Sequence, residues 1–137
     1  MKKRFMAAVT AGVAVAAVVL VPGAAHAADN DRLVTSTEGA AIGLTVDWTS
    51  YNSLVLRDVY LKDTGDDGHS VFFYVTATRS FQYPNHWNKS GYNTTAHWDA
   101  LPGSLTSEIA FVDVTVCRDK LFDNCATSRQ SKNPYVF

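Results

Sequence analysis

The chain has little of several features that define common protein classes. It contains two cysteines and four prolines among 137 residues. Two cysteines are too few for a scaffold held by many bridges, and their spacing is far from the C-x-x-C of redox enzymes. No apolar segment after residue 21 approaches the roughly 20 residues that a membrane span needs. The sequence therefore predicts no membrane-spanning helix beyond the N-terminal region.

Motifs of catalysis and nucleic-acid binding are missing as well. The chain has no G-x-S-x-G elbow that would make a serine nucleophilic. The nine basic residues after residue 27 are scattered among acidic ones and form no stripe. Removal of residues 1–27 would lower the formal net charge from −1 to −4, which is unfavourable for binding phosphates. We expect a protein that is not an enzyme, needs no cofactor and binds no nucleic acid.

The N-terminal segment, by contrast, has a clear pattern. Basic residues 2–4 precede an apolar run over residues 6–21, and an A-x-A cleavage site follows at residues 25–27. This order is typical of a secretory signal peptide. We predict a signal peptide over residues 1–27 and a single secreted, extracellular domain over residues 28–137 that has no membrane contact after cleavage.

Both cysteines, Cys117 and Cys125, lie in the predicted secreted domain. In an exported protein an isolated pair is most simply a disulfide. The closed loop is short, so the bridge would stabilise the fold by roughly 2.5 kcal/mol. A zinc site would need two further ligands, and no histidine or cysteine lies nearby in the sequence.

Alternation of apolar and polar residues indicates strands throughout the domain. We predict strands over residues 42–48, 54–62, 70–81, 92–98, 105–117 and 135–137, turns at 51–53, 63–68 and 101–104, and a long connection over 82–93. The strands 54–62 and 70–81 are expected to pair as a hairpin, with Val55, Val59 and Leu61 on the buried face of the first. The sequence therefore predicts an all-β fold, a small antiparallel β-sandwich of about five to seven strands, and a small barrel would give the same pattern.

Aromatic and amide side chains gather after the third predicted strand. Trp87, Tyr92 and Trp98 have flat apolar faces on which sugar rings can stack, and Asn85 and Asn88 can hydrogen-bond sugar hydroxyls. Loops that carry such residues on a rigid sandwich are common binding sites. One hypothesis is therefore a non-catalytic domain that binds a glycan or another cell-surface polymer. The alternative is that these aromatic rings cover the core at one end of the sandwich.

The loop 117–125 carries the second functional hypothesis. A disulfide at its ends would hold the loop rigid, and a preorganised loop loses less entropy when it docks. Arg118, Lys120 and Phe122 are suitable side chains for the specificity pocket of a protease. The sequence is thus also consistent with a secreted protease inhibitor whose partner is a protein.

The turn with Asp63, Asp66 and Asp67 is a weak candidate for a metal site. Ca²⁺ binds carboxylate and carbonyl oxygens from flexible loops, but the spacing does not match an EF-hand. Aspartate and glycine are also what an ordinary turn uses. Both interpretations remain open at this stage.

A small hydrolase is the third hypothesis. Its acid–base pair would have to come from His69, His86 or His97 together with Glu38 or Glu108. Their spacing in the sequence does not favour such a pair. We therefore expect the histidines to be ordinary surface residues.

Three segments point to a group of related proteins. Residues 62–71 (KDTGDDGHSV), 116–119 (VCRD) and 124–128 (NCATS) resemble the small secreted proteins of unknown function that are abundant in filamentous actinobacteria. The resemblance implies a compact β domain in which the two cysteines join around a short loop after a late strand. It implies no activity and no site residues.

Overall fold

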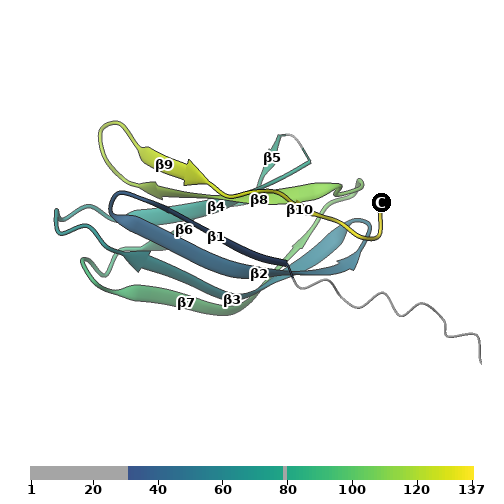
Figure 1. Ribbon diagram of the computed structural model, residues 1–137, viewed down its shortest axis with the longest axis horizontal. Coiled ribbons are helices and arrows are strands. Elements are labelled where there is room, and N and C mark those ends of the chain that lie inside the picture. Colours follow the sequence, from purple (N-terminus) through teal and green to yellow (C-terminus); the bar gives the residue numbers. More distant parts are fainter. Residues whose placement is uncertain (1–30, 79) are drawn as a thin grey trace, which may run out of the picture.

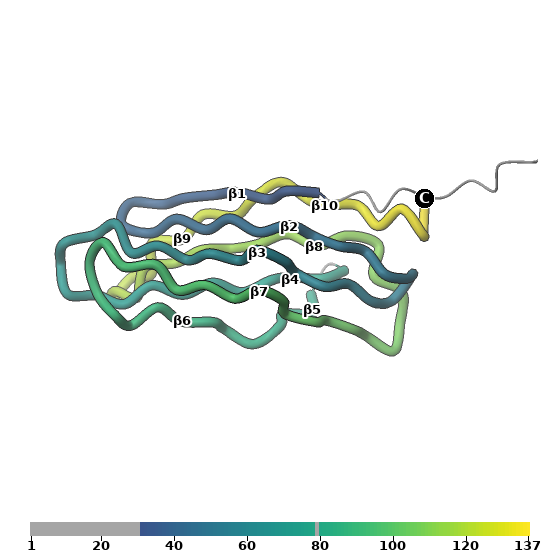
Figure 2. The backbone as a smooth tube through the Cα atoms, turned by 90° about the horizontal axis from the view of Figure 1, so that it is seen from below, coloured from purple at the N-terminus to yellow at the C-terminus, as the bar shows by residue number. Residues whose placement is uncertain are grey.

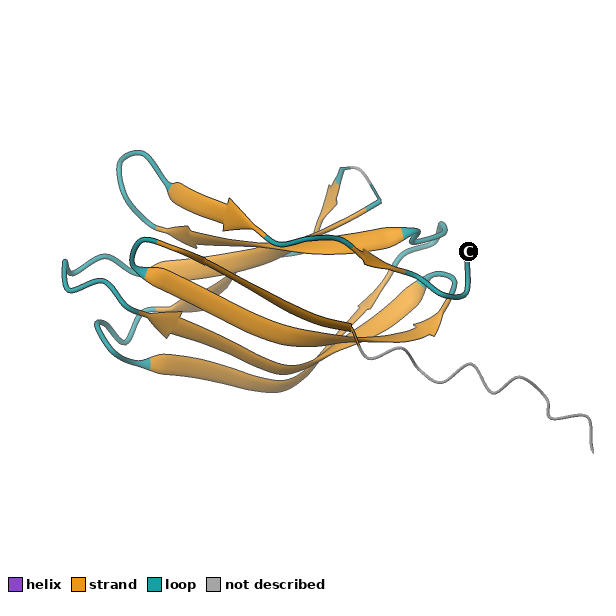
Figure 3. Ribbon diagram, viewed as in Figure 1, coloured by secondary structure: helices purple, strands orange, loops and turns teal. Residues whose placement is uncertain are grey.

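The structure, a computed structural model, describes residues 31–78 and 80–137. These residues contain ten strands and no helix, and the strands form two antiparallel sheets packed face to face (Figure 1, Figure 3). The prediction of an all-β antiparallel sandwich is confirmed. The strand number exceeds the expectation because the sequence did not indicate β1 (Asp31–Thr37) and because four short strands border the longer ones: β5 (Phe81–Gln82), β6 (His86–Asn88), β9 (Asn124–Thr127) and β10 (Ser131–Lys132). The predicted signal peptide, residues 1–27, lies outside the described residues.

Each sheet has a simple order. The four-stranded sheet, sheet A, has the order β1-β2-β3-β7, and its strands lie side by side in Figure 2. Its strands are β1 (Asp31–Thr37), β2 (Ala40–Ser50), β3 (Ser53–Asp63) and β7 (Thr95–Ser104). In the six-stranded sheet, sheet B, the order is β10-β8-β4-β5, while β6 pairs with β4 and β9 pairs with β8. Its strands are β4 (Val71–Ala77), β5 (Phe81–Gln82), β6 (His86–Asn88), β8 (Phe111–Arg118), β9 (Asn124–Thr127) and β10 (Ser131–Lys132).

Among the described residues there is no helix that could cross a membrane.

The core lies between the two sheets and follows from the alternation in the sequence. Every second residue of a strand points to the same face, so a row of apolar residues covers the inner side of each sheet. Sheet A contributes, among others, Leu33, Ile42, Leu44, Val46, Trp48, Val59 and Leu61. Sheet B contributes Val71, Phe73, Val75, Ala77, Val112, Val114 and Val116. These side chains are almost fully removed from solvent, and their burial stabilises the sandwich.

The buried face of β3 differs in part from the prediction. Val59 and Leu61 are fully buried, as expected, but Val55 is only half-buried. Its neighbours Leu54 and Leu56 point into the core instead. The buried positions are thus even-numbered in the first half of β3 and odd-numbered in the second half.

A β-bulge causes this change of face. Gly43 of β2 pairs with Tyr60, whereas Thr45 pairs with Arg57, so β3 holds one residue more than the strand opposite. The extra residue lies at Asp58, whose φ of 48° is in the left-handed region. Aspartate is one of the few residues other than glycine that adopt this conformation at modest cost. A bulge reverses the alternation, and simple period-two counting cannot foresee it.

The expected hairpin between β3 and β4 is wrong, because the two strands belong to different sheets. β3 pairs along one edge with β2 and along the other with β7, so neither edge is left for β4. The chain after Asp63 therefore crosses from sheet A to sheet B through residues 64–70 (Figure 1). Turn-forming residues showed where the chain changes direction, but not which sheet receives the next strand.

The segment predicted as a turn at residues 101–104 is the end of β7. Its Pro102 pairs with Val55, and because β7 is an edge strand the missing N–H faces no further neighbour. The short strand expected at 135–137 is also absent, and β10 pairs with β8 a few residues earlier instead. Within the expected long connection 82–93, residues 86–88 form β6.

Asn133 ties the C-terminal segment to the rest of the domain. Its side chain is fully buried, and its Nδ2 donates to the carbonyl oxygens of Ser50 at 3.1 Å, Tyr51 at 3.3 Å and Ile109 at 2.8 Å. Its Oδ1 accepts from the backbone N–H of Tyr135 at 2.9 Å. One amide therefore satisfies backbone groups from three separate segments at this end of the sandwich.

We expect Asn133→Asp to lower the free energy of unfolding by about 3 to 5 kcal/mol, because a buried carboxylate would face three carbonyl oxygens with nothing to donate. The loss should be larger at about pH 8 than at about pH 4, where the carboxyl group is partly protonated. Urea denaturation followed by tryptophan fluorescence measures it. The matched control is Asn85→Asp, since Asn85 is exposed and its Oδ1 already accepts a hydrogen bond. Equal stability of the two variants would contradict this role of Asn133.

Candidate functional site

The three aromatic residues expected to bind a sugar do not form one platform. Trp98 is half-buried in β7, and its ring makes an edge contact with the core residue Phe73 at a centroid distance of 5.6 Å. Trp87 of β6 pairs with Phe72, and the two rings are tilted against each other with their centroids 4.5 Å apart. Phe72 and Phe73 are neighbours on one strand and point to opposite faces of sheet B. Trp98 therefore lies on the inner side of sheet B and Trp87 on its outer side, while Tyr92 is 57% exposed in the loop between β6 and β7.

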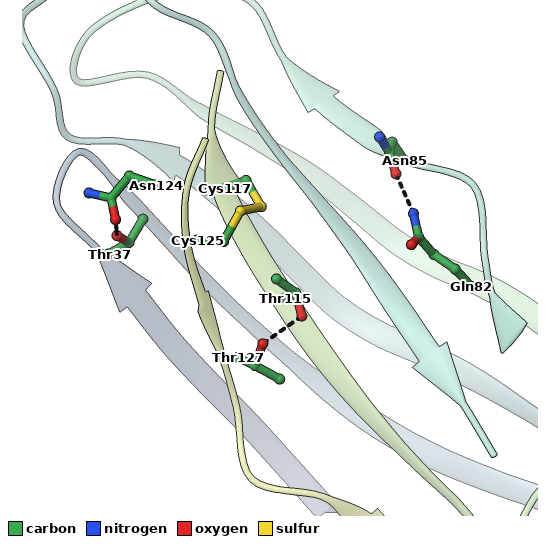
Figure 4. The surroundings of a disulfide bond; sticks show 8 residues. All are labelled: Thr37, Gln82, Asn85, Thr115, Cys117, Asn124, Cys125 and Thr127. Atoms are coloured by element: carbon green, nitrogen blue, oxygen red, sulfur yellow. Dashed lines mark hydrogen bonds between the residues drawn. A yellow bond between two sulfur atoms is a disulfide. The ribbon is translucent and has the colours of Figure 1, made fainter. Parts of the chain in front are cut away.

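The two asparagines of the same hypothesis also have different surroundings. Asn88 is 2% exposed, and its Nδ2 donates to the carbonyl oxygens of Leu61 at 3.2 Å and Thr94 at 3.1 Å. It thereby joins β6 of sheet B to β3 of sheet A. Asn85 is exposed and accepts a hydrogen bond from Gln82 (Figure 4). Of the two amides, only that of Asn85 is open to solvent.

The ring of Trp87, on the outer side of sheet B, is half-buried. The Lys89 ammonium lies 5.2 Å from its centroid, in the range of a cation–π contact. Phe72 contacts the same ring. A sugar stacked on Trp87 would therefore share the ring with two existing neighbours.

The three aspartates of the crossing segment are not equivalent. Asp63 is buried, and its Oδ1 accepts the backbone N–H of Gly65 at 3.0 Å. Asp67 forms ion pairs with Arg118 and, at 3.9 Å, with Lys120, while Asp66 is exposed. Across residues 31–78 and 80–137 no group of three or more His, Cys, Asp or Glu side chains is arranged to hold a metal.

Partial desolvation raises the pKa of Asp67, but the hydrogen bond to the His69 amide and the charge of Arg118 outweigh it. The net pKa of Asp67 lies below its ordinary value, so this carboxylate is ionised at neutral pH. Its role in the described structure is to neutralise Arg118.

Arg118 is buried at the base of the β8–β9 hairpin rather than presented to a partner. The residue is 6% exposed, and one guanidinium nitrogen donates to the carbonyl oxygen of Glu38 at 3.3 Å. A Cβ atom placed on Gly39 or Gly65 would come within 2.7 Å of the Arg118 side chain. Glycine at these two positions therefore makes room for the arginine between the β1–β2 turn and the crossing segment. Burial and pairing remove Arg118 as a free anchor for a protease pocket.

The disulfide predicted between Cys117 and Cys125 is present. The two residues are direct partners in the β8–β9 ladder, with Cα atoms 4.1 Å apart (Figure 4). On the same face, the hydroxyl groups of Thr115 and Thr127 hydrogen-bond at 2.8 Å (Figure 4). A disulfide of this kind is compatible with an oxidising environment.

The tip of this hairpin exposes two consecutive apolar side chains. Leu121 is 92% exposed and Phe122 is 85% exposed. Charged residues, Lys120 before them and Asp123 after them, flank the pair. We call residues 120–123 the hairpin tip. Sequence reasoning singled out Phe122 but missed Leu121, although two adjacent apolar residues among charges were a visible signal.

The base of the hairpin is held to the sandwich from both sides. The Thr37 hydroxyl of β1 donates to Oδ1 of Asn124 at 2.7 Å (Figure 4). On the other side, the backbone N–H of Asp119 donates to the carbonyl oxygen of Ser70 at 2.9 Å. The tip thus projects from a fixed base, and its apolar pair lies beyond every one of these contacts.

The histidines and glutamates of the hydrolase hypothesis lie in separate surroundings. His86 stacks on Phe73 at 5.1 Å, and burial lowers its pKa. His97 points to solvent beside Asp99, with 3.3 Å between Nδ1 and Oδ1. His69 lies in the exposed crossing segment, Glu38 in the β1–β2 turn and Glu108 in the segment before β8.

Comparisons with protein-family models, with curated proteins and with solved structures find no match to this chain. The resemblance to actinobacterial secreted proteins therefore stays a prediction. Function has to be argued from the geometry of the described residues.

We expect replacement of both cysteines by serine to lower the free energy of unfolding by about 2.5 kcal/mol, because the bridge closes a loop with a sequence separation of 8. Reduction of the wild-type protein should give the same loss in urea denaturation. The matched control replaces Thr115 and Thr127, the next pair on this face, by valine, and should cost no more than about 1 kcal/mol. Unchanged stability after complete reduction would contradict the prediction.

Proposed function

We propose that this protein is a secreted, non-catalytic binding protein that recognises a protein partner through the hairpin tip. The observation that carries the proposal is the exposure of Leu121 and Phe122 on a hairpin whose base is cross-linked. Secretion is part of the proposal. It rests on the predicted signal peptide, and the Cys117–Cys125 disulfide is compatible with it.

A rigid base favours binding because little freedom is lost when the tip docks. Below the apolar pair, the Cys117–Cys125 bridge, the buried Arg118 side chain and the Asn124–Thr37 hydrogen bond restrain both strands. In the turn that joins β8 to β9, the backbone N–H of Lys120 donates to the carbonyl oxygen of Arg118 at 3.0 Å. The tip is therefore held in place before any partner arrives.

The two exposed apolar side chains supply part of the free energy that a specific complex needs. Transfer of one leucine and one phenylalanine side chain from water to an apolar pocket contributes about 3 to 6 kcal/mol. A dissociation constant of about 1 µM corresponds to about 8 kcal/mol. Contacts around the two anchors, with the flanking Lys120 and Asp123 at a polar rim, therefore have to supply the remainder of a micromolar affinity.

Among protein partners, we favour a serine protease with a deep apolar specificity pocket. Inhibitors of such enzymes present an exposed side chain on a rigid loop. Of the three side chains that the sequence offers for this purpose, Arg118 is buried, Lys120 is within 3.9 Å of Asp67, and Phe122 is exposed. The geometry therefore supports a chymotrypsin-like preference for a large apolar residue over a trypsin-like preference for a basic one.

The test measures inhibition of chymotrypsin, subtilisin and trypsin by the oxidised protein. We expect inhibition of the first two, and Phe122→Ala should weaken it about 30-fold or more, as loss of a hot-spot anchor does. The matched control is Tyr51→Ala, because Tyr51 is an exposed aromatic residue in the β2–β3 turn, away from the hairpin tip. Absence of inhibition at about 10 µM, or equal inhibition by the Phe122→Ala variant, would overturn the protease assignment.

Glycan or polymer binding is the second candidate, and the exposed ring of Tyr92 together with the outer ring of Trp87 supports it. We expect any retention on insoluble polysaccharides to fall in Trp87→Ala and Tyr92→Ala, because sugar rings stack on aromatic faces. Val34→Ala is the control, since Val34 is exposed on the far edge of sheet A. A protein that is retained equally well without Trp87 and Tyr92 does not use these rings.

A further inference from the structure

A cavity of about 230 Å³ opens between the two sheets, and none of its lining residues belongs to the hairpin tip. Its inner wall is apolar and consists of Leu54 and Leu56 of β3 and Val75 of β4. Leu101 of β7 completes the apolar lining, and two polar side chains, Tyr83 and His86, stand beside it. The cavity therefore combines an apolar interior with two side chains that can form hydrogen bonds.

The cavity exists because the edges of the two sheets do not close over it. On sheet B, β5 ends at Gln82 and β6 begins at His86, so residues 83–85 form no strand. Pro84 lies in this gap, and Pro102 lies on the edge strand β7 of the other sheet. Both prolines are exposed, both line the cavity, and neither has an N–H group with which to extend a ladder. Proline at these two positions thus keeps both sheet edges from extending across the cavity.

Tyr83 leaves a polar atom without a partner beside this cavity. Its hydroxyl is shielded from solvent and has no hydrogen-bond partner among the residues that the structure describes. The hydroxyl lies against Gly103, where a Cβ atom would come within 3.1 Å of it. Burial of an unpaired hydroxyl costs free energy, and a rotation of the Tyr83 side chain that brings the hydroxyl to a hydrogen-bonding group of a ligand in the cavity would recover that cost.

His86 supplies the second polar group. Its ring is stacked on Phe73 and meets the edge of Trp98 at 5.6 Å, so its orientation is fixed by the core. Burial lowers the pKa of His86, which keeps the imidazole neutral at neutral pH. A neutral imidazole offers one donor and one acceptor, and it does not demand a charged partner.

The size of the cavity limits the ligand. An engineered protein cavity of about 150 Å³ with an apolar lining binds benzene. The present cavity is larger by about the space that a second fused ring needs. A charged molecule is disfavoured, because the leucine and valine walls offer nothing to replace its hydration.

We propose that the cavity between β7 and residues 83–86 binds a small, planar, uncharged molecule of one or two aromatic rings that carries a single hydrogen-bonding group, with Tyr83 as the partner of that group. This site shares no lining residue with the hairpin tip. Its function is therefore additional to the proposed recognition of a protein, and either can fail without the other.

The test uses 2-naphthol and naphthalene, which differ by one hydroxyl group. Titration of the oxidised full domain is followed by two-dimensional NMR, and the expected shifts centre on Val75, Leu101 and Gly103. Tyr83→Phe should weaken binding of 2-naphthol about five- to tenfold, the effect of one hydrogen bond, and leave naphthalene binding unchanged. The melting temperature of the Tyr83→Phe variant should be no lower than that of the wild type, because this variant lacks the unpaired hydroxyl.

Further variants separate binding in the cavity from binding elsewhere on the surface. Leu101→Trp fills the cavity and should abolish binding of both probes, with Leu101→Phe as the milder substitute if the first variant unfolds. The matched control is Leu105→Trp, because Leu105 is also half-buried against the core but does not line the cavity. Phe122→Ala should bind both probes like the wild type.

Three results would overturn the proposal. The first is a folded wild-type protein whose cavity resonances do not shift up to the solubility limit of either probe. The second is undiminished binding to folded Leu101→Trp, which would place the probes elsewhere. The third is a 2-naphthol affinity that Tyr83→Phe leaves unchanged, which would remove the assigned role of the hydroxyl.

Discussion

The pairing of β3 on both edges is the constraint on which the rest of the fold depends. β2 occupies one edge and β7 the other, so the chain that leaves Asp63 has no strand position beside β3. It must start a second sheet, and the apolar faces of the two sheets are then buried against each other. The crossing segment brings Gly65 and Asp67 over the end of the sandwich, where they enclose and neutralise Arg118. In this way a pairing in the middle of one sheet determines how the far end is closed.

The two ends of the sandwich are closed in different ways. Around Arg118, a hydrogen bond to Glu38 and an ion pair with Asp67 hold the buried side chain, and the hairpin that starts there is restrained while its tip stays outside. Along the edge between β7 and residues 83–85, two prolines prevent further pairing and a cavity remains. A single sandwich thus offers a rigid projecting surface and a recessed apolar one. The first suits a partner with a pocket, and the second suits a ligand small enough to enter.

Much of this fold was predictable, and the failures have definite physical causes. The alternation in residues 42–48 and in the first half of 70–81 identified two strands, because period-two burial is a direct consequence of backbone geometry. The presence of a single cysteine pair in a chain with a predicted signal peptide identified the bridge. The bulge at Asp58 was not predictable, since it depends on the register against β2 and not on local preference. The continuation of β7 through Pro102 depends on its place at a sheet edge, and only the completed topology reveals that place.

The candidate sites show the same division between local and global information. Sequence composition drew attention to Trp87 and Trp98, but it could not tell that Trp87 contacts Phe72 on one face of β4 while Trp98 contacts Phe73 on the other. Leu121 and Phe122 are a different case. They are consecutive, and in a strand one of two consecutive residues faces away from the core. Inside a loop closed by a bridge of sequence separation 8, there is no room for a helix that could bury both. The exposure of at least one of them was therefore implied by the sequence.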